Sequence, residues 1–190
     1  MKDTAEILAE ALKVLKEGGV ILYPTDTVWG LGCDATNAAA VERIFEIKHR
    51  PANKSLVLLA SDLDMVARFV RQIPSIAIDL VEVNDSPMTI IYPEGQGLAP
   101  NVLAEDSSVG IRIPMNEFCR SLAFKLRRPL VSTSANISGE PTPALFREIS
   151  PEIKNAVDYC VPAFLEKEAT GKASQIIKLG LDGEVEIIRR

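Results

Sequence analysis

Short apolar runs alternate with amphipathic helical segments along most of this chain. In residues 4–17 apolar side chains recur at helical spacing, and the apolar run 20–23 follows after two glycines. Further helices are predicted over residues 38–50, 62–71, 73–83 and 117–126, and further strands over residues 56–60, 88–92, 109–113, 130–132, 175–179 and 185–188. This alternation favours an α/β domain with a mixed sheet. No repeat, low-complexity tract or linker divides the chain, so residues 1–190 are expected to form one domain.

Charge and the scarcity of metal-ligating residues exclude several classes of protein. The net charge is −5, so the general basic footprint of a nucleic-acid-binding protein is missing. Three cysteines lie far apart and the chain has one histidine, which disfavours a disulfide framework, a zinc site and a serine–histidine triad. We expect buried free thiols and no metal site. Because no signal peptide or membrane-length apolar segment is visible, a cytoplasmic protein with no membrane partner is expected.

Polar residues gather directly after predicted strands, where ligands bind in open α/β sheets. The first such knot, residues 24–27, ends the strand 20–23 and is followed by Trp29. Another, "STSAN" at 132–136, carries hydroxyls and an amide after an apolar run. Its backbone N–H groups form either an anion-binding nest or a polar turn that satisfies itself.

A basic loop lies at residues 48–55. Pro51 favours an extended backbone at Arg50, so Lys48 and Arg50, two positions apart, are expected to point the same way. With Lys54 they suit a polyphosphate; the alternative is an ordinary helix C-terminus, where cations favour the helix dipole. The P-loop and dinucleotide-binding glycine patterns are absent, so any phosphate site here must use these cations and the serine motif.

Four segments in order, "PTDTVWGLG", "IKHRPANKSLVLL", "VGIRIP" and "PLVSTSANISGEPTP", with a weaker "GKASQII", resemble the YrdC/Sua5 family. The resemblance covers nearly the whole chain from about Val20. The chain is similar to the short, single-domain form of the family. It implies an α/β fold with a twisted mixed sheet and flanking helices around a concave cleft. The activity it implies is nucleotidyl transfer: L-threonine, bicarbonate and ATP give threonylcarbamoyl-AMP and pyrophosphate. The threonylcarbamoyl group then modifies adenosine 37 of tRNA.

The same resemblance assigns site residues one by one. It implies catalytic roles for Lys48 and Arg50. It implies ATP-binding roles for Lys54, Ser108, Ser134, Asn136 and Arg189, and threonine-binding roles for Thr27, Arg112, Ser132 and Ser174. Mg²⁺ is expected to accompany ATP. The strand that ends in the first knot would form one wall of the threonine pocket, with Trp29 packed in that wall.

The sequence departs from the family pattern in two places and leaves two other functions open. A Trp-Pro-Gly-Pro stretch of many members is replaced by "NDSPMTII", and a late Ser-Thr by Ser174-Gln175. The alternative function is a double-stranded RNA-binding or ribosome-maturation factor, and a carbamoyl-transfer module is a third. The expected partners are ATP, L-threonine and bicarbonate, with tRNA or double-stranded RNA as further candidates and functional coupling to a threonylcarbamoyl transferase complex.

Overall fold

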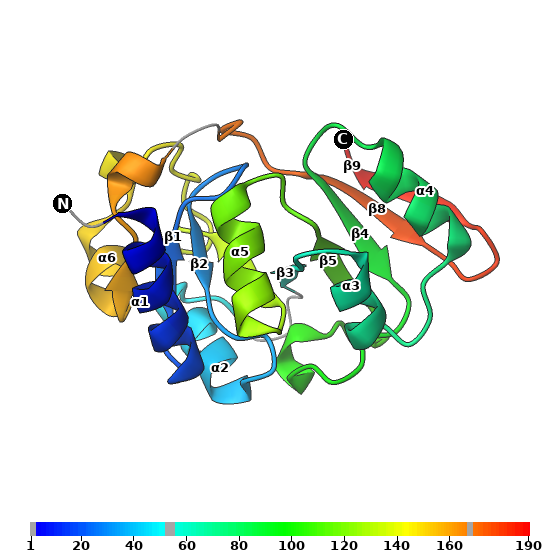
Figure 1. Ribbon diagram of the computed structural model, residues 1–190, viewed down its shortest axis with the longest axis horizontal. Helices are drawn as coiled ribbons and strands as arrows, with labels where there is room; N and C mark the ends of the chain where they lie inside the picture. Colours follow the sequence, from blue (N-terminus) through cyan, green and yellow to red (C-terminus); the bar gives the residue numbers. More distant parts are fainter. Residues whose placement is uncertain (1–2, 52–55, 167–168) are drawn as a thin grey trace.

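The computed structural model describes residues 3–51, 56–166 and 169–190, and Figure 1 shows helices packed against a twisted sheet. The α-helices are α1 (Thr4–Lys16), α2 (Ala38–Ile47), α3 (Leu63–Phe69), α4 (Ser75–Val83), α5 (Glu117–Leu126) and α6 (Pro151–Ala156), with short 3₁₀ helices at Pro100–Val102, Phe146–Glu148 and Ala163–Leu165. The strands are β1 (Ile21–Tyr23), β2 (Gly30–Gly32), β3 (Val57–Leu59), β4 (Met88–Tyr92), β5 (Val109–Arg112), β6 (Leu130–Ser134), β7 (Tyr159–Cys160), β8 (Gln175–Leu179) and β9 (Val185–Arg189). Each predicted helix and strand is confirmed, with ends shifted by a few residues.

The described strands form one sheet in the order β7-β1-β2-β6-β3-β5-β4-β8-β9. Parallel pairs, such as β3 with β5, lie beside antiparallel pairs, such as β2 with β6. The predicted mixed α/β sheet is therefore confirmed. Figure 1 shows α1 and α5 side by side in front of the sheet, where they cover its apolar face.

Local sequence explains where the helices begin. The Asp3 side chain accepts the N–H of Glu6 at 2.8 Å, and the Glu6 carboxylate accepts the N–H of Asp3, which makes a capping box. Asn37 caps α2 in the same way, through the N–H of Ala40 at 3.1 Å. No helix in the described ranges has both the length and the apolarity needed to span a bilayer.

Two strands that bear on the site differ from the prediction. The glycine-rich β2 was not predicted, and β6 continues through Ser134 instead of ending at Ser132. Ser132 pairs with Val57 of β3, whereas Ser134 pairs with Gly30 of β2. The first three residues of "STSAN" are therefore strand, and the interpretation of that stretch as a nest or a turn is wrong for them. Their backbone runs as the last three residues of strand β6.

Candidate active site

A cavity of about 430 Å³ lies on one face of the sheet. Most of its wall comes from alternating strand residues. In β5 and the residue before it, Ser108, Gly110 and Arg112 line the cavity, whereas Val109 and Ile111 point the other way into the hydrophobic core. The cavity therefore lies over a face of the sheet, and it also includes residues at strand ends, such as Thr27 after β1 and Ser134 at the end of β6.

Most of the predicted site residues meet in this cavity. Those on its wall are Thr27, Arg50, Ser108, Arg112, Ser132, Ser134, Ser174 and Arg189. They come from segments more than 100 positions apart in the sequence, and no carboxylate side chain stands with them among the described lining residues. The wall presents hydroxyl and guanidinium donors, which suits a ligand with several anionic oxygens.

Glycine gives this cavity its depth. A Cβ on Gly110 would lie 3.3 Å from Cγ2 of Thr89, and a Cβ on Gly30 would lie 3.4 Å from Oγ of Ser132. Both glycines line the cavity. A side chain at either position would occupy space that a ligand can use.

Lys48 lies beside the cavity and not on its wall. Its ammonium donates to the carbonyl oxygens of Ser134 and, at 2.6 Å, of Asn136, and the side chain is 2% exposed. Burial lowers the pKa of Lys48 to about 8, with a smaller contribution from the nearby Arg50 guanidinium. In this geometry the lysine holds the backbone that follows β6; its predicted catalytic role stays a prediction.

The C-terminus of α2 sets the backbone from which Lys48 and Arg50 project. The N–H of Arg50 donates to the carbonyl of Phe45 at 2.9 Å, and the N–H of His49 donates to that of Glu46 at 3.0 Å. This is a Schellman motif, with His49 at φ 49° in the position that usually holds glycine. Lys48 has a helical backbone and His49 a left-handed one, so the expected extended backbone is absent at these two residues. The side chains of Lys48 and Arg50 nevertheless both reach the β6 stretch, at Ser134 and Thr133.

Arg50 lies on the cavity wall, whereas Asn136 does not. Arg50 lines the cavity, where its Nη1 lies 3.4 Å from Oγ1 of Thr133, and burial lowers its pKa. The Asn136 amide donates to the carbonyls of Ile137 and Glu140 and is not on the cavity wall. Neither Asn136, predicted to bind ATP, nor Lys48, predicted to be catalytic, lies on the cavity wall, and both roles stay predictions. Lys54 lies outside the described residues.

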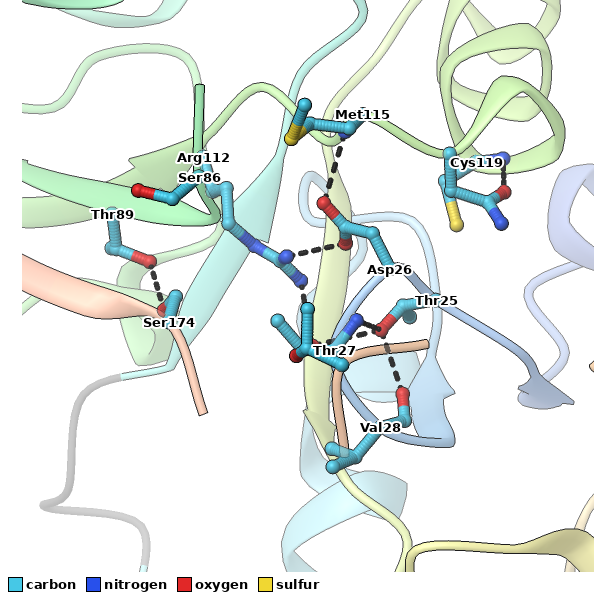
Figure 2. Close-up of polar contacts among 12 residues, drawn as sticks. Thr25, Asp26, Thr27, Val28, Ser86, Thr89, Arg112, Met115, Cys119 and Ser174 are labelled. Atoms are coloured by element: carbon cyan, nitrogen blue, oxygen red, sulfur yellow. Dashed lines mark hydrogen bonds and ion pairs between the residues drawn. The ribbon is translucent and has the colours of Figure 1, made fainter. Parts of the chain in front are cut away.

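The first knot closes one end of the cavity (Figure 2). Arg112 donates through Nη1 to the Asp26 carboxylate and through Nη2 to Oγ1 of Thr27 at 3.3 Å. The other Asp26 oxygen accepts the N–H of Met115 at 2.9 Å. Oγ1 of Thr27 also lies 2.9 Å from Oγ1 of Thr25. Thr25, Asp26, Thr27 and Arg112 are nearly inaccessible to solvent, so the end of the cavity is a preformed polar cluster.

A second hydroxyl pair and an arginine lie on the neighbouring wall. Oγ of Ser174 lies 2.8 Å from Oγ1 of Thr89 (Figure 2), and its carbonyl accepts Nε–H of Arg189 at 2.9 Å. Burial, and next the nearby Arg112, lower the pKa of Arg189. The departure after Ser174 has therefore not displaced that serine from the wall.

Ser108 is held by a loop bond outside the cavity. Its N–H donates to Asp106 at 3.0 Å, and the other Asp106 oxygen forms an ion pair with Lys178 at 3.0 Å. Hydrogen bonds from Ser108 and then from Lys178 lower the pKa of Asp106 to about 2.

Sequence reasoning missed several wall residues. Thr89, Thr133 and Thr142 line the cavity but were not assigned to it. Thr89 and Ile91 are two positions apart in β4, so their side chains point to the same face of the sheet, and both line the cavity. This alternation was the available signal for Thr89. Trp29 packs in the wall as predicted, with its ring centroid 4.9 Å from that of Phe146. The described residues contain no metal-ligating cluster.

The cavity and its motifs match a known family. A model of the Sua5, YciO and YrdC proteins, described as "Telomere recombination", matches residues 13–190. This chain belongs to the Sua5/YciO/YrdC family. Its relatives include the threonylcarbamoyl-AMP synthase of Stenotrophomonas maltophilia, 36% identical over 94% of this chain and 96% of that protein. Another, from Idiomarina loihiensis, is 33% identical over 92% of this chain and 90% of that protein.

Solved structures of the Sua5/YciO/YrdC family share the fold. Sua5 of P. abyssi complexed with L-threonine superimposes with a TM-score of 0.83 at 27% identity, covering 94% of this chain. This chain spans 52% of that Sua5 chain, so about half of the longer protein has no counterpart here. YciO of E. coli matches with a TM-score of 0.80 at 25% identity, over 100% of this chain and 91% of that one. The predicted YrdC-like fold is confirmed.

Proposed function

We propose that this protein is an L-threonylcarbamoyladenylate synthase, a nucleotidyltransferase that uses ATP, L-threonine and bicarbonate. The observation that carries the proposal is the convergence of Arg50, Arg112 and Arg189 with a set of hydroxyl side chains in one cavity. Full-length relatives named threonylcarbamoyl-AMP synthase support it and favour it over the RNA-binding alternative. A Sua5 structure holding L-threonine supports an amino-acid subsite.

The reaction asks mainly for positioning and charge neutralisation. The threonine amine attacks the bicarbonate carbon to give a carbamate, with loss of water. A carbamate oxygen then attacks the α-phosphorus of ATP, and the bond to the β-phosphate oxygen breaks, releasing pyrophosphate. In the proposal Arg112 binds the threonine carboxylate and leaves the amine free, while Arg50 offsets phosphate charge. Donors already fixed in place stabilise such charge without reorganising.

Mg²⁺ is proposed to enter as part of the ATP substrate. The described wall has no aspartate or glutamate, so it offers hydroxyl oxygens but no carboxylate ligand for a resident ion. Mg²⁺ is commonly held through substrate phosphates and water, with few protein ligands. The steps assigned above to the arginines do not depend on where the ion lies.

Pyrophosphate release from ATP tests the function directly. We expect release only when L-threonine and bicarbonate are both present, and omission of either should abolish it. Arg50→Ala should abolish release, whereas Arg120→Ala on the surface of α5, whose side chain is absent from the cavity wall, should leave it intact. Release that needs neither co-substrate would contradict the proposal. Transfer of the product to tRNA is expected to need a threonylcarbamoyl transferase complex.

A further inference from the structure

Asp26 is a buried carboxylate directly behind a cavity arginine. It is 5% exposed and is absent from the cavity wall, whereas Arg112, its ion-pair partner, is on the wall and 3% exposed. Figure 2 shows the Asp26 carboxylate between the Arg112 guanidinium and the Met115 backbone. Asp26 therefore touches a residue of the site without facing the cavity itself.

Three segments of the chain meet at Asp26. Its carboxylate accepts Arg112 from β5 and the N–H of Met115 ahead of α5, and its carbonyl accepts the N–H of Thr170 at 3.0 Å. The neighbouring carbonyl of Thr27 accepts the N–H of Gly171 at 2.9 Å. One donor on each carboxylate oxygen orients the side chain, and the two backbone bonds hold the loop that carries it.

The donors that Asp26 leaves unused define what Arg112 can bind. Nη1 is given to Asp26, and Nη2 makes only a long contact of 3.3 Å to Thr27. Nε is buried and has no hydrogen-bond partner among the described residues. A buried donor without an acceptor costs free energy, which an incoming acceptor recovers. Arginine binds carboxylates through two such donors at once.

We propose that Asp26 is a positioning residue, which holds the Arg112 guanidinium so that Nε and Nη2 receive the carboxylate of the amino-acid substrate. This inference rests on the proposed function, because it assumes that the cavity takes L-threonine. Asp26 also neutralises the charge of Arg112, which disfavours inorganic polyanions at this end. Loss of the carboxylate frees the guanidinium to leave the orientation that two-point binding needs.

Asp26→Asn tests the inference, because it keeps the size of the side chain and removes its charge and one acceptor. The matched control is Asp34→Asn. Asp34 is likewise buried, pairs with Arg128 at 2.7 Å and accepts the N–H of Thr36, but lies away from the cavity wall. Both variants lose a charged hydrogen bond, so a general effect on folding should appear in both.

Titration calorimetry with L-threonine, followed by steady-state kinetics, gives the readout. We expect Asp26→Asn to weaken L-threonine binding by roughly tenfold to a hundredfold, the effect of losing a charge-assisted hydrogen bond. The KM for L-threonine should rise while the KM for ATP stays within about twofold, and Asp34→Asn should change neither. Unchanged or tighter threonine binding by Asp26→Asn would overturn the inference alone. Absence of threonine binding to the unaltered protein would overturn the proposed function and the inference together.

A measurement on the unaltered protein covers the case in which Asp26→Asn does not fold. The side-chain Nε–H signal of Arg112, assigned with Arg112→Lys, is followed by NMR during an L-threonine titration. We expect it to shift, while the Arg128 signal stays in place. A signal of Arg112 that does not respond to saturating L-threonine would overturn the inference.

Discussion

The buried ammonium of Lys48 couples the stability of this protein to pH in a defined window. Burial lowers the pKa of Lys48 from 10.5 to about 8 in the folded chain. Between these values the unfolded chain binds more protons than the folded one, so stability must rise with pH. Below pH 7 both states carry the proton and the lysine adds no slope. Lys48→Met removes this contribution and keeps much of the side chain's volume.

The magnitude follows from the two pKa values. Relative to full protonation, the lowered pKa stabilises the folded chain very little at pH 7.5 and by about 1 kcal/mol at pH 9. The difference in unfolding free energy between the unaltered protein and Lys48→Met should therefore increase by about 1 kcal/mol from pH 7.5 to pH 9, in favour of the unaltered protein. Other titrating groups cancel in the comparison, because both proteins carry them.

Urea denaturation at pH 7.5, 8.2 and 9 measures this difference. Lys48→Arg is the control, since arginine keeps its charge throughout and should show no such rise against Lys48→Met. A difference between the unaltered protein and Lys48→Met that is constant across the range would refute the assignment of a lowered pKa. We also expect pyrophosphate release to fall above pH 8, because a neutral Lys48 holds the Ser134 and Asn136 carbonyls less firmly.

Three further predictions concern the cavity and its frame. Gly110→Ala places a Cβ 3.3 Å from Thr89 Cγ2. Pyrophosphate release should fall at least tenfold, with a near-native melting temperature. Full activity would contradict the inference that the ligand uses the space above Gly110. His49→Gly relieves a left-handed backbone at φ 49°, so urea unfolding should show a gain of about 1 kcal/mol with unchanged activity. Asp106→Asn loosens Ser108, so the KM for ATP should rise severalfold and that for L-threonine should not; equal rises in both would contradict a role for this loop at the nucleotide.

Strand β2 shows what sequence patterning could not reveal. Its residues Gly30, Leu31 and Gly32 include one apolar side chain and two glycines, which disfavour a strand locally. The structure needs those glycines, because a Cβ on Gly32 would lie 2.5 Å from Cε1 of Tyr23 and 2.7 Å from the Val131 carbonyl. Close approach of neighbouring strands decides this element, and such tertiary contacts leave no periodicity in the sequence.

The basic loop shows a different limit. Its composition correctly predicted a cationic residue on the cavity wall, which is Arg50. The backbone at Lys48 and His49 was mispredicted as extended, because the proline rule was applied without the helix ending that precedes it. A Schellman ending usually requires glycine, and His49 gave no sign of it. Apolar periodicity, by contrast, predicted the helices well, because burial of one helix face is a local pattern.

The acidic balance of the chain and the cationic cavity are compatible because charge acts locally. The net charge is −5, yet the described wall of the cavity carries arginines and no carboxylate. At physiological salt the screening length is about 8 Å, so carboxylates on distant surfaces contribute little inside the cavity. The nearest buried carboxylate, Asp26, is already engaged by Arg112 and Met115. Whole-chain charge therefore argues against a broad nucleic-acid surface and says nothing against an enclosed site for a nucleotide and an amino acid.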